Sequence, residues 1–137
     1  MGDYTGLRFK GIIKPEYRKD FEGIALSGDW GKSKHDLFNF FGTDNSAGMI
    51  PCGVLAAYLP DDWLESTEFA RQWNEKTGYW VFDCSMKNYW FTIDHFLEIV
   101  PEFVEFIEHL EVRYEYWDES KFYKLVDGQL KEVNNDH

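Results

Sequence analysis

The stretch Tyr79–Met86, which reads YWVFDCSM, decides the fold class because its side chains alternate with a period of two. The apolar residues at even positions share one face of the expected strand: Trp80, Phe82, Cys84 and Met86. Bulky apolar residues on one face and a mixed opposite face are typical of a central strand with one side on the core. The stretch therefore predicts a sheet.

Further strands are expected on both sides of this stretch. The clearest signal is the dipeptide Asp127-Gly128, because a two-residue type I′ turn needs positive φ at both positions. Such a turn joins two strands and places Leu125 opposite Leu130. The strands expected from alternation and turn signals are Thr5–Ile13, Val54–Tyr58, Leu110–Trp117, Lys121–Val126 and Gln129–Val133.

Helical spacing of apolar residues marks the segments between the strands. In the longest segment, apolar residues recur at steps of three and four, and Pro101 inside it is expected to kink or split the helix. Gly42–Gly53 reads as a loop that is long enough to be functional. The expected helices are Pro15 to about Leu26, Lys34–Phe41, one from Asp62 that ends before Gly78, and Thr92 to about His109.

Together these elements predict one α+β domain over residues 1–137. We expect a mixed, mainly antiparallel sheet with helices packed mostly on one face and a C-terminal β-hairpin. The length of 137 residues matches one domain. The residues from Met1 to Gly6 have no signal-peptide pattern and no apolar run approaches 18 residues, which predicts a cytoplasmic protein without a membrane partner. Cys52 and Cys84 are then expected to be reduced thiols.

Charge is the sharpest functional signal. The formal net charge is -11, which argues against direct binding to nucleic acid and favours a basic partner. Between Asp94 and Glu119 the chain has nine acidic residues and one basic residue, Arg113. On the expected long helix, Glu98, Glu102 and Glu105 form one stripe, which is either a solvated face or a docking surface.

The docking interpretation assigns the partner to a protein with a basic surface, with the chain acting as an inhibitor, an immunity-type protein or a mimic of nucleic acid. Tyr116 and Trp117 would serve as aromatic anchors, because tyrosine and tryptophan are enriched at binding hot spots. The partner-binding residues expected on this basis are Glu98, Glu102, Glu105, Glu111, Glu115, Tyr116 and Trp117.

Motifs for catalysis and metal binding give no positive signal. Asp94, His95 and Glu98 lie on adjacent turns, but no Glu-x-x-His, zinc-protease or calcium-loop motif accompanies them. Cys84 lies in an apolar row, where burial makes a thiol unreactive. No nucleophile elbow or phosphate-binding glycine loop occurs. The sequence therefore favours a protein that is not an enzyme and uses no cofactor or metal.

Two alternatives stay open. Aromatic residues make up 19% of the chain, so an aromatic-lined cleft for a small molecule, or a small enzyme, is one of them. Trp63 and Trp90 are the expected ligand-binding residues of such a cleft, because each lies in or after a loop. The other alternative is a homo-oligomer that buries the surplus aromatic residues between subunits.

Three stretches carry a resemblance. They are Gly6–Gly11 (GLRFKG), Lys14–Arg18 (KPEYR) and Asp83–Tyr89 (DCSMKNY). Here the chain resembles small uncharacterised proteins of Gram-positive bacteria and their mobile elements. The resemblance covers most of the chain and implies no particular activity or catalytic residue. It favours a role in conflict between hosts and mobile elements, where acidic inhibitors and immunity proteins are frequent.

Overall fold

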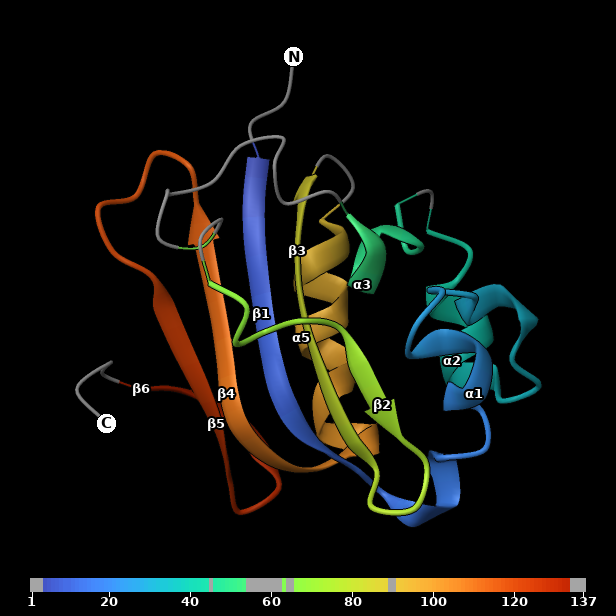
Figure 1. Ribbon diagram of the computed structural model, residues 1–137. Helices are drawn as coiled ribbons and strands as arrows, with labels where there is room; N and C mark the ends of the chain where they lie inside the picture. Colours follow the sequence, from blue (N-terminus) through green and yellow to red (C-terminus); the bar gives the residue numbers. More distant parts are fainter. Residues whose placement is uncertain (1–3, 45, 54–62, 64–65, 89–90, 134–137) are drawn as a thin grey trace.

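The fold is α+β, as the strand and helix patterns predicted. The computed structural model describes residues 4–44, 46–53, 63, 66–88 and 91–133. In this part of the chain six strands form one sheet in the order β2-β3-β1-β4-β5-β6 (Figure 1), and every neighbouring pair is antiparallel. The strands are β1 (Tyr4–Ile13), β2 (Gln72–Asn74), β3 (Tyr79–Lys87), β4 (Val104–Tyr114), β5 (Lys121–Val126) and β6 (Gln129–Val133).

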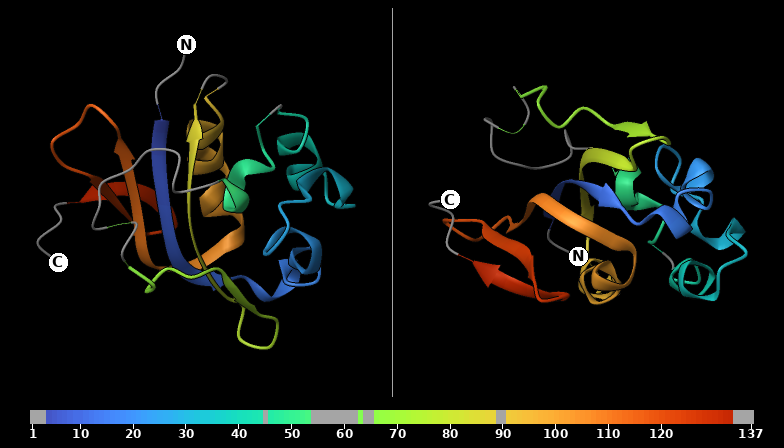
Figure 2. Two further views of the ribbon diagram at one scale, coloured as in Figure 1. Left: turned by 45° about the horizontal axis from the view of Figure 1, so that its top comes forward. Right: turned by 90° about the horizontal axis from the view of Figure 1, so that it is seen from below.

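The helical segments lie mainly on one side of the sheet. α5, in gold, runs along one face, and the turns between residues 15 and 52 extend the layer beside it (Figure 1). Seen from below, residues 66–71 lie on the opposite side of the sheet from α5 (Figure 2). The helical segments are η1 (Pro15–Tyr17), α1 (Phe21–Ile24), η2 (Trp30–Lys32), α2 (Asp36–Phe41), α3 (Met49–Cys52) and α5 (Thr92–Phe103).

The centre of the sheet is β1, which pairs with β3 on one side and β4 on the other. Phe9 lies opposite Phe82 and Leu110, and Leu7 lies opposite Cys84. These five side chains are buried, and burial raises the pKa of the Cys84 thiol far above its usual value. The central strand predicted from YWVFDCSM is confirmed, and so is the prediction that Cys84 is buried in the core.

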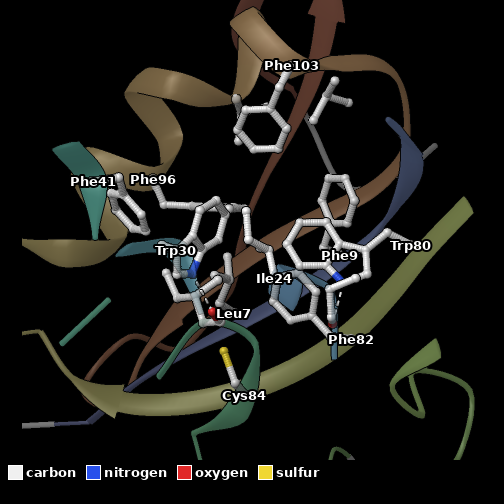
Figure 3. Packing of buried hydrophobic residues seen from close by; sticks show 14 of the residues in the cluster. Leu7, Phe9, Ile24, Trp30, Phe41, Trp80, Phe82, Cys84, Phe96 and Phe103 are labelled. Carbon is white, nitrogen blue, oxygen red and sulfur yellow. Dashed lines mark hydrogen bonds between the residues drawn. The ribbon is translucent and has the colours of Figure 1, made fainter. Parts of the chain in front are cut away.

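Aromatic side chains fill the space between the sheet and the helices (Figure 3). Trp30 and Trp80 are fully buried, and each satisfies its polar atom with the backbone. The indole Nε1 of Trp30 donates to the Ile50 carbonyl at 2.7 Å, and that of Trp80 donates to the Ala25 carbonyl at 2.8 Å. A tryptophan can enter a core without loss only with such a partner. Much of the high aromatic content is therefore core.

The C-terminal hairpin is confirmed residue by residue. Asp127 and Gly128 have φ values of 54° and 76°, as a type I′ turn requires. Leu125 pairs with Leu130, so the register follows the turn. Both leucines pack against the edge of the core.

The prediction of one long helix from Thr92 to about His109 is wrong for the residues after Phe103. α5 ends there, and the next residue begins β4, which runs to Tyr114 along β1. Pro101 occupies the last turn of α5 and does not split it. The pairing of β4 with β1 shifts register at two places, between Lys10/Gly11 and between Ile12/Ile13. These irregularities break the alternation of the strand, which is why its sequence looks helical.

Two other helix predictions fail for different reasons. The segment from Pro15 to Leu26 contains only the short η1 and α1, because the chain turns between them. Of the helix expected from Asp62, Trp63 is helical, but residues 66–77 are not, and β2 pairs with β3 there instead. The strand expected at Val54–Tyr58 lies outside the described residues. Within the described residues, no helix has the length and apolar character needed to cross a membrane.

Candidate functional site

A hollow of about 500 Å³ lies between α2, the loop that follows it and α5. We call it the α2–α5 cleft. Its size falls in the usual range for ligand-binding pockets, about 300–1,000 Å³. It combines apolar side chains with two carboxylates and an imidazole. The lining residues are Phe40, Phe41, Thr43, Asp44, His95, Glu98 and Ile99.

The position of one wall depends on two glycines that touch. α2 ends at Gly42, and a Cβ at this position would lie 2.4 Å from the amide nitrogen of Gly31 and 2.6 Å from its Cα. No side chain fits that space. The contact brings the end of α2 against η2, and the chain then turns so that Asp44 reaches α5.

Replacing Gly42 with alanine should destabilise the protein by about 1–3 kcal/mol, because the new methyl group must push η2 and α2 apart. Urea unfolding followed by circular dichroism measures the loss. The matched control is Gly23→Ala, since a Cβ there meets nothing closer than 3.8 Å. Equal behaviour of the two variants would contradict the close contact.

Asp44 is the polar centre of the cleft. Its Oδ1 accepts a hydrogen bond from the Thr92 hydroxyl at 2.7 Å and another from the Ser46 amide at 3.2 Å. Its Oδ2 lies 3.1 Å from His95 Nδ1. The Asp44 side chain is largely covered, whereas half of the His95 side chain is exposed. The carboxylate thus joins the loop after α2 to the first turns of α5.

The hydrogen bonds around Asp44 also fix its charge. Burial by itself raises the pKa of the Asp44 carboxyl, but the bonds from Thr92, Ser46 and His95 outweigh burial and hold the pKa below its usual 3.8. Asp44 is therefore ionised at neutral pH and can only accept hydrogen bonds. A neutral His95 must then carry its proton on Nδ1, which leaves Nε2 as an acceptor.

Asp44→Asn should reduce stability by about 1–3 kcal/mol near neutral pH, since the charged acceptor is lost. Because folding lowers the pKa of Asp44, its contribution is complete above pH 3.8 and disappears as the pH falls through the folded-state pKa. The difference in the free energy of unfolding between wild type and Asp44→Asn should therefore become smaller below pH 3.8. Urea unfolding at a series of pH values measures it. Asp118→Asn, at an exposed carboxylate, is the control. A difference in the free energy of unfolding that does not change with pH would contradict the lowered pKa of Asp44.

The outer side of α5 is acidic and borders the cleft. Asp94, Glu98 and Glu102 are all exposed and follow each other at steps of four residues. α5 contains no lysine or arginine to balance them. We call these three residues the α5 acidic ridge. On the other wall, Phe40 leaves 79% of its surface exposed, which is unusual for so large an apolar side chain.

A strained residue stands at the start of α5. Phe91 has a φ of 57°, in the left-handed region that bulky residues rarely adopt, and its ring is exposed. The side chain of Asn88 caps the helix from outside by accepting from the Ile93 amide at 2.9 Å. Left-handed residues of this kind cluster at functional sites. A second exposed phenylalanine thus lies one residue before Thr92, the partner of Asp44.

The residues predicted to bind a partner do not form one surface. Glu98 and Glu102 lie on α5, but Glu105 follows the end of the helix and belongs to β4. Glu115 follows the last residue of β4, so the length of the strand separates it from Glu105. Tyr116 and Trp117 are exposed beside Glu115 in the β4–β5 connection. They lie in the connection between β4 and β5 and not on α5, which carries the acidic ridge.

Glu111 is not part of any exposed surface, because only 6% of it is accessible. It faces the side of the sheet away from α5, where His109 Nε2 lies 2.8 Å from its carboxylate and Arg8 lies 3.9 Å away. Burial raises its pKa, but the hydrogen bond from His109 and the charge of Arg8 bring it below its usual value. The prediction that Glu111 contacts a partner is therefore replaced by a structural role in an ion cluster.

The expectation that Trp63 is an exposed ligand platform is also corrected. Its exposed fraction is 1%, and its ring covers the Arg8 guanidinium at 4.0 Å from the ring centroid. Phe69 lies over the same guanidinium at 4.5 Å, and Asp83 lies 3.9 Å from Arg8 Nε. We call Arg8, Trp63, Phe69, Asp83 and Glu111 the Arg8 cluster. Trp90, the other expected platform, lies outside the described residues.

Sequence reasoning placed Asp94, His95 and Glu98 on adjacent turns but missed Asp44 as their neighbour. Asp44 is 51 residues from His95 and lies in a loop, so only the fold brings them together. Across the residues that the structure describes, no group of three or more histidine, cysteine, aspartate or glutamate side chains is arranged to hold a metal ion. What the cleft offers chemically is two carboxylates, one imidazole acceptor and an exposed aromatic wall.

Comparisons with known proteins add no relative: no family model, curated protein or solved structure matches this chain.

Proposed function

We propose that this protein is a stoichiometric, non-enzymatic protein-binding module of the inhibitor or immunity type, and that it docks a basic partner on the face formed by α2 and α5. The observation that carries the proposal is the α2–α5 cleft, in which an exposed aromatic wall stands beside the α5 acidic ridge. The binding surface is centred on Phe40, Glu98 and Glu102. Glu105 extends it at the end of α5.

Apolar and charged groups have separate roles in this proposal. Phe40 supplies the apolar area that a hot spot needs, since aromatic side chains dominate the energetics of protein interfaces. The ridge supplies attraction over distance, which speeds association with a basic surface and rejects acidic ones. The net charge of -11 acts in the same direction over the whole molecule.

The proposal is tested by charge reversal with a matched control. The variant Glu98→Lys/Glu102→Lys changes the ridge, and Glu22→Lys/Glu75→Lys makes the same change in net charge at exposed positions outside α5 and its strand neighbours. Tagged wild type and both variants are used to capture partners from a lysate of the organism that encodes the chain, at low and high salt. Captured proteins are identified and their affinities measured by calorimetry.

The proposal expects a stoichiometric partner whose affinity falls at least about tenfold in the ridge variant and changes little in the control variant. Added salt should weaken the wild-type complex, because salt screens exposed charges. A partner that binds both variants equally would contradict the assignment of the face. The absence of any partner of wild type at low salt would contradict the protein-binding function in that organism.

A second candidate is favoured by the volume of the cleft. About 500 Å³ accommodates a small molecule, and Asp44 orients an imidazole toward it. In that case a metabolite should raise the melting temperature of the wild type by mass action, and Glu98→Gln should reduce the shift. A metabolite thermal-shift screen separates this candidate from the protein-binding module.

A further inference from the structure

The α2–α5 cleft presents two hydrogen-bond acceptors on one side of a helix. Asp44 accepts from His95 Nδ1, so in the neutral form of the ring Nε2 carries a lone pair, and no described residue is hydrogen-bonded to Nε2. Glu98 follows three residues later and lines the same hollow. Residues at this spacing have Cβ atoms about 5–6 Å apart, which puts both acceptors within reach of one planar donor group.

The remaining lining decides which donor fits. The ring of Phe40 is exposed beside the acceptors, and Phe41 and Ile99 add apolar surface deeper in the hollow. A guanidinium group has five donors in a rigid plane, stacks on aromatic faces and is more weakly hydrated than an ammonium group. An anion is disfavoured, because Asp44 and Glu98 both place negative charge in the cleft.

We propose that the α2–α5 cleft is the receptor for an arginine side chain of the basic partner, with His95 Nε2 and Glu98 accepting from the guanidinium and Phe40 stacking on it. The proposal rests on the protein-binding function and names the group that the cleft recognises. Asp44 acts through His95: it fixes the tautomer and the orientation of the ring, and it adds negative charge behind it. It is therefore a positioning residue.

The test uses small probes, so it does not depend on the identity of the partner. Blocked arginine (Nα-acetyl-arginine methylamide), blocked lysine and blocked citrulline are titrated into the isotope-labelled protein and followed by NMR. Citrulline has nearly the shape of arginine but no charge. Arginine should shift the signals of the His95 imidazole and the Phe40 ring, with a dissociation constant at least about tenfold lower than that of citrulline and below that of lysine.

Two variants locate the site. Glu98→Gln keeps the size of the side chain and should weaken arginine binding about tenfold, whereas Glu22→Gln should leave it unchanged. Amide spectra check that both variants keep the fold. Equal affinity for arginine and citrulline, shifts away from His95 and Phe40, or an unchanged affinity in Glu98→Gln would each overturn the proposal.

Failure of this proposal and failure of the protein-binding function are distinguishable. If a partner is lost in Glu98→Lys/Glu102→Lys but no arginine probe binds the cleft, the docking face stands and the arginine receptor is wrong. If arginine binds as described but the lysate contains no partner that depends on the ridge, the receptor stands and the protein-binding function fails.

Discussion

Arg8→Ala is expected to destabilise the protein by about 3–5 kcal/mol, because it removes the guanidinium that lies beside the covered carboxylates of Asp83 and Glu111. Burial already raises the pKa of Asp83, although the charge of Arg8 pulls it down. Without Arg8, the free energy needed to keep Asp83 ionised in the folded protein must increase. Trp63 and Phe69 also lose the guanidinium that they cover. Chemical unfolding of the purified variant near neutral pH measures the loss.

Acidification supplies a sharper check of the Arg8 cluster. In Arg8→Ala, protonation of Asp83 and Glu111 removes the negative charges that Arg8 no longer balances. The loss in free energy of unfolding relative to wild type should therefore become smaller as the pH falls. The double variant Arg8→Met/Asp83→Asn replaces a charged pair by neutral groups of similar size and should recover part of the loss. A deficit below about 1 kcal/mol for Arg8→Ala would show that the cluster is solvated rather than buried.

Trp30→Ala is expected to cost about 3–5 kcal/mol as well, because it opens a cavity in the centre of the aromatic core. The Trp30 ring contacts Phe41 of α2 at a centroid distance of 4.8 Å and Phe96 of α5 at 6.1 Å. Its loss should therefore also loosen the α2–α5 cleft. The hydrogen bond to the Ile50 carbonyl disappears with it. Unfolding in urea, followed by circular dichroism, gives the loss of stability.

Trp30→Phe separates the contributions of packing and hydrogen bonding. It keeps an aromatic ring in the site but leaves the Ile50 carbonyl without its donor. Loss of this hydrogen bond should cost about 1 kcal/mol, in addition to the cost of the smaller ring. The phenylalanine variant should be clearly more stable than the alanine variant. If Trp30→Ala unfolds at nearly the wild-type urea concentration, Trp30 is not in the core.

Local sequence signals predicted the parts of the fold that local physics controls. The even positions of YWVFDCSM are apolar because that face of β3 lies on the core, although Val81 and Ser85 on the opposite face are buried as well. Asp127-Gly128 determines a hairpin register by itself, since the turn geometry leaves little choice. In both cases neighbouring residues carry the information, so no distant contact was needed.

The boundary between α5 and β4 shows where local signals fail. The buried residues of β4 include Val104, Ile107 and Leu110, which are three apart and continue the helical spacing of α5. That spacing arises because the pairing with β1 is irregular at Gly11 and Ile13. Only the presence of β1 as a partner distinguishes strand from helix here, and a pattern within one segment does not contain it.

The candidate site depends even more on distant contacts. The charge pattern correctly placed Glu98 and Glu102 on one helix. Glu111 belongs to the same acidic stretch of sequence, but it is buried beside Arg8 of β1. Asp44 reaches His95 only because the loop after α2 folds onto α5. The Asp-Asn-Ser composition of that loop was its only local signal.

The most direct test of the central claim is the affinity of the captured partner for three proteins, measured under the same low-salt conditions. They are wild type, Glu98→Lys/Glu102→Lys on the α5 acidic ridge, and Glu22→Lys/Glu75→Lys elsewhere on the surface. Docking on the α2–α5 face predicts that the ridge variant alone loses at least about tenfold in affinity. Equal losses in both variants would mean that net charge, and not this face, attracts the partner, which would contradict the account.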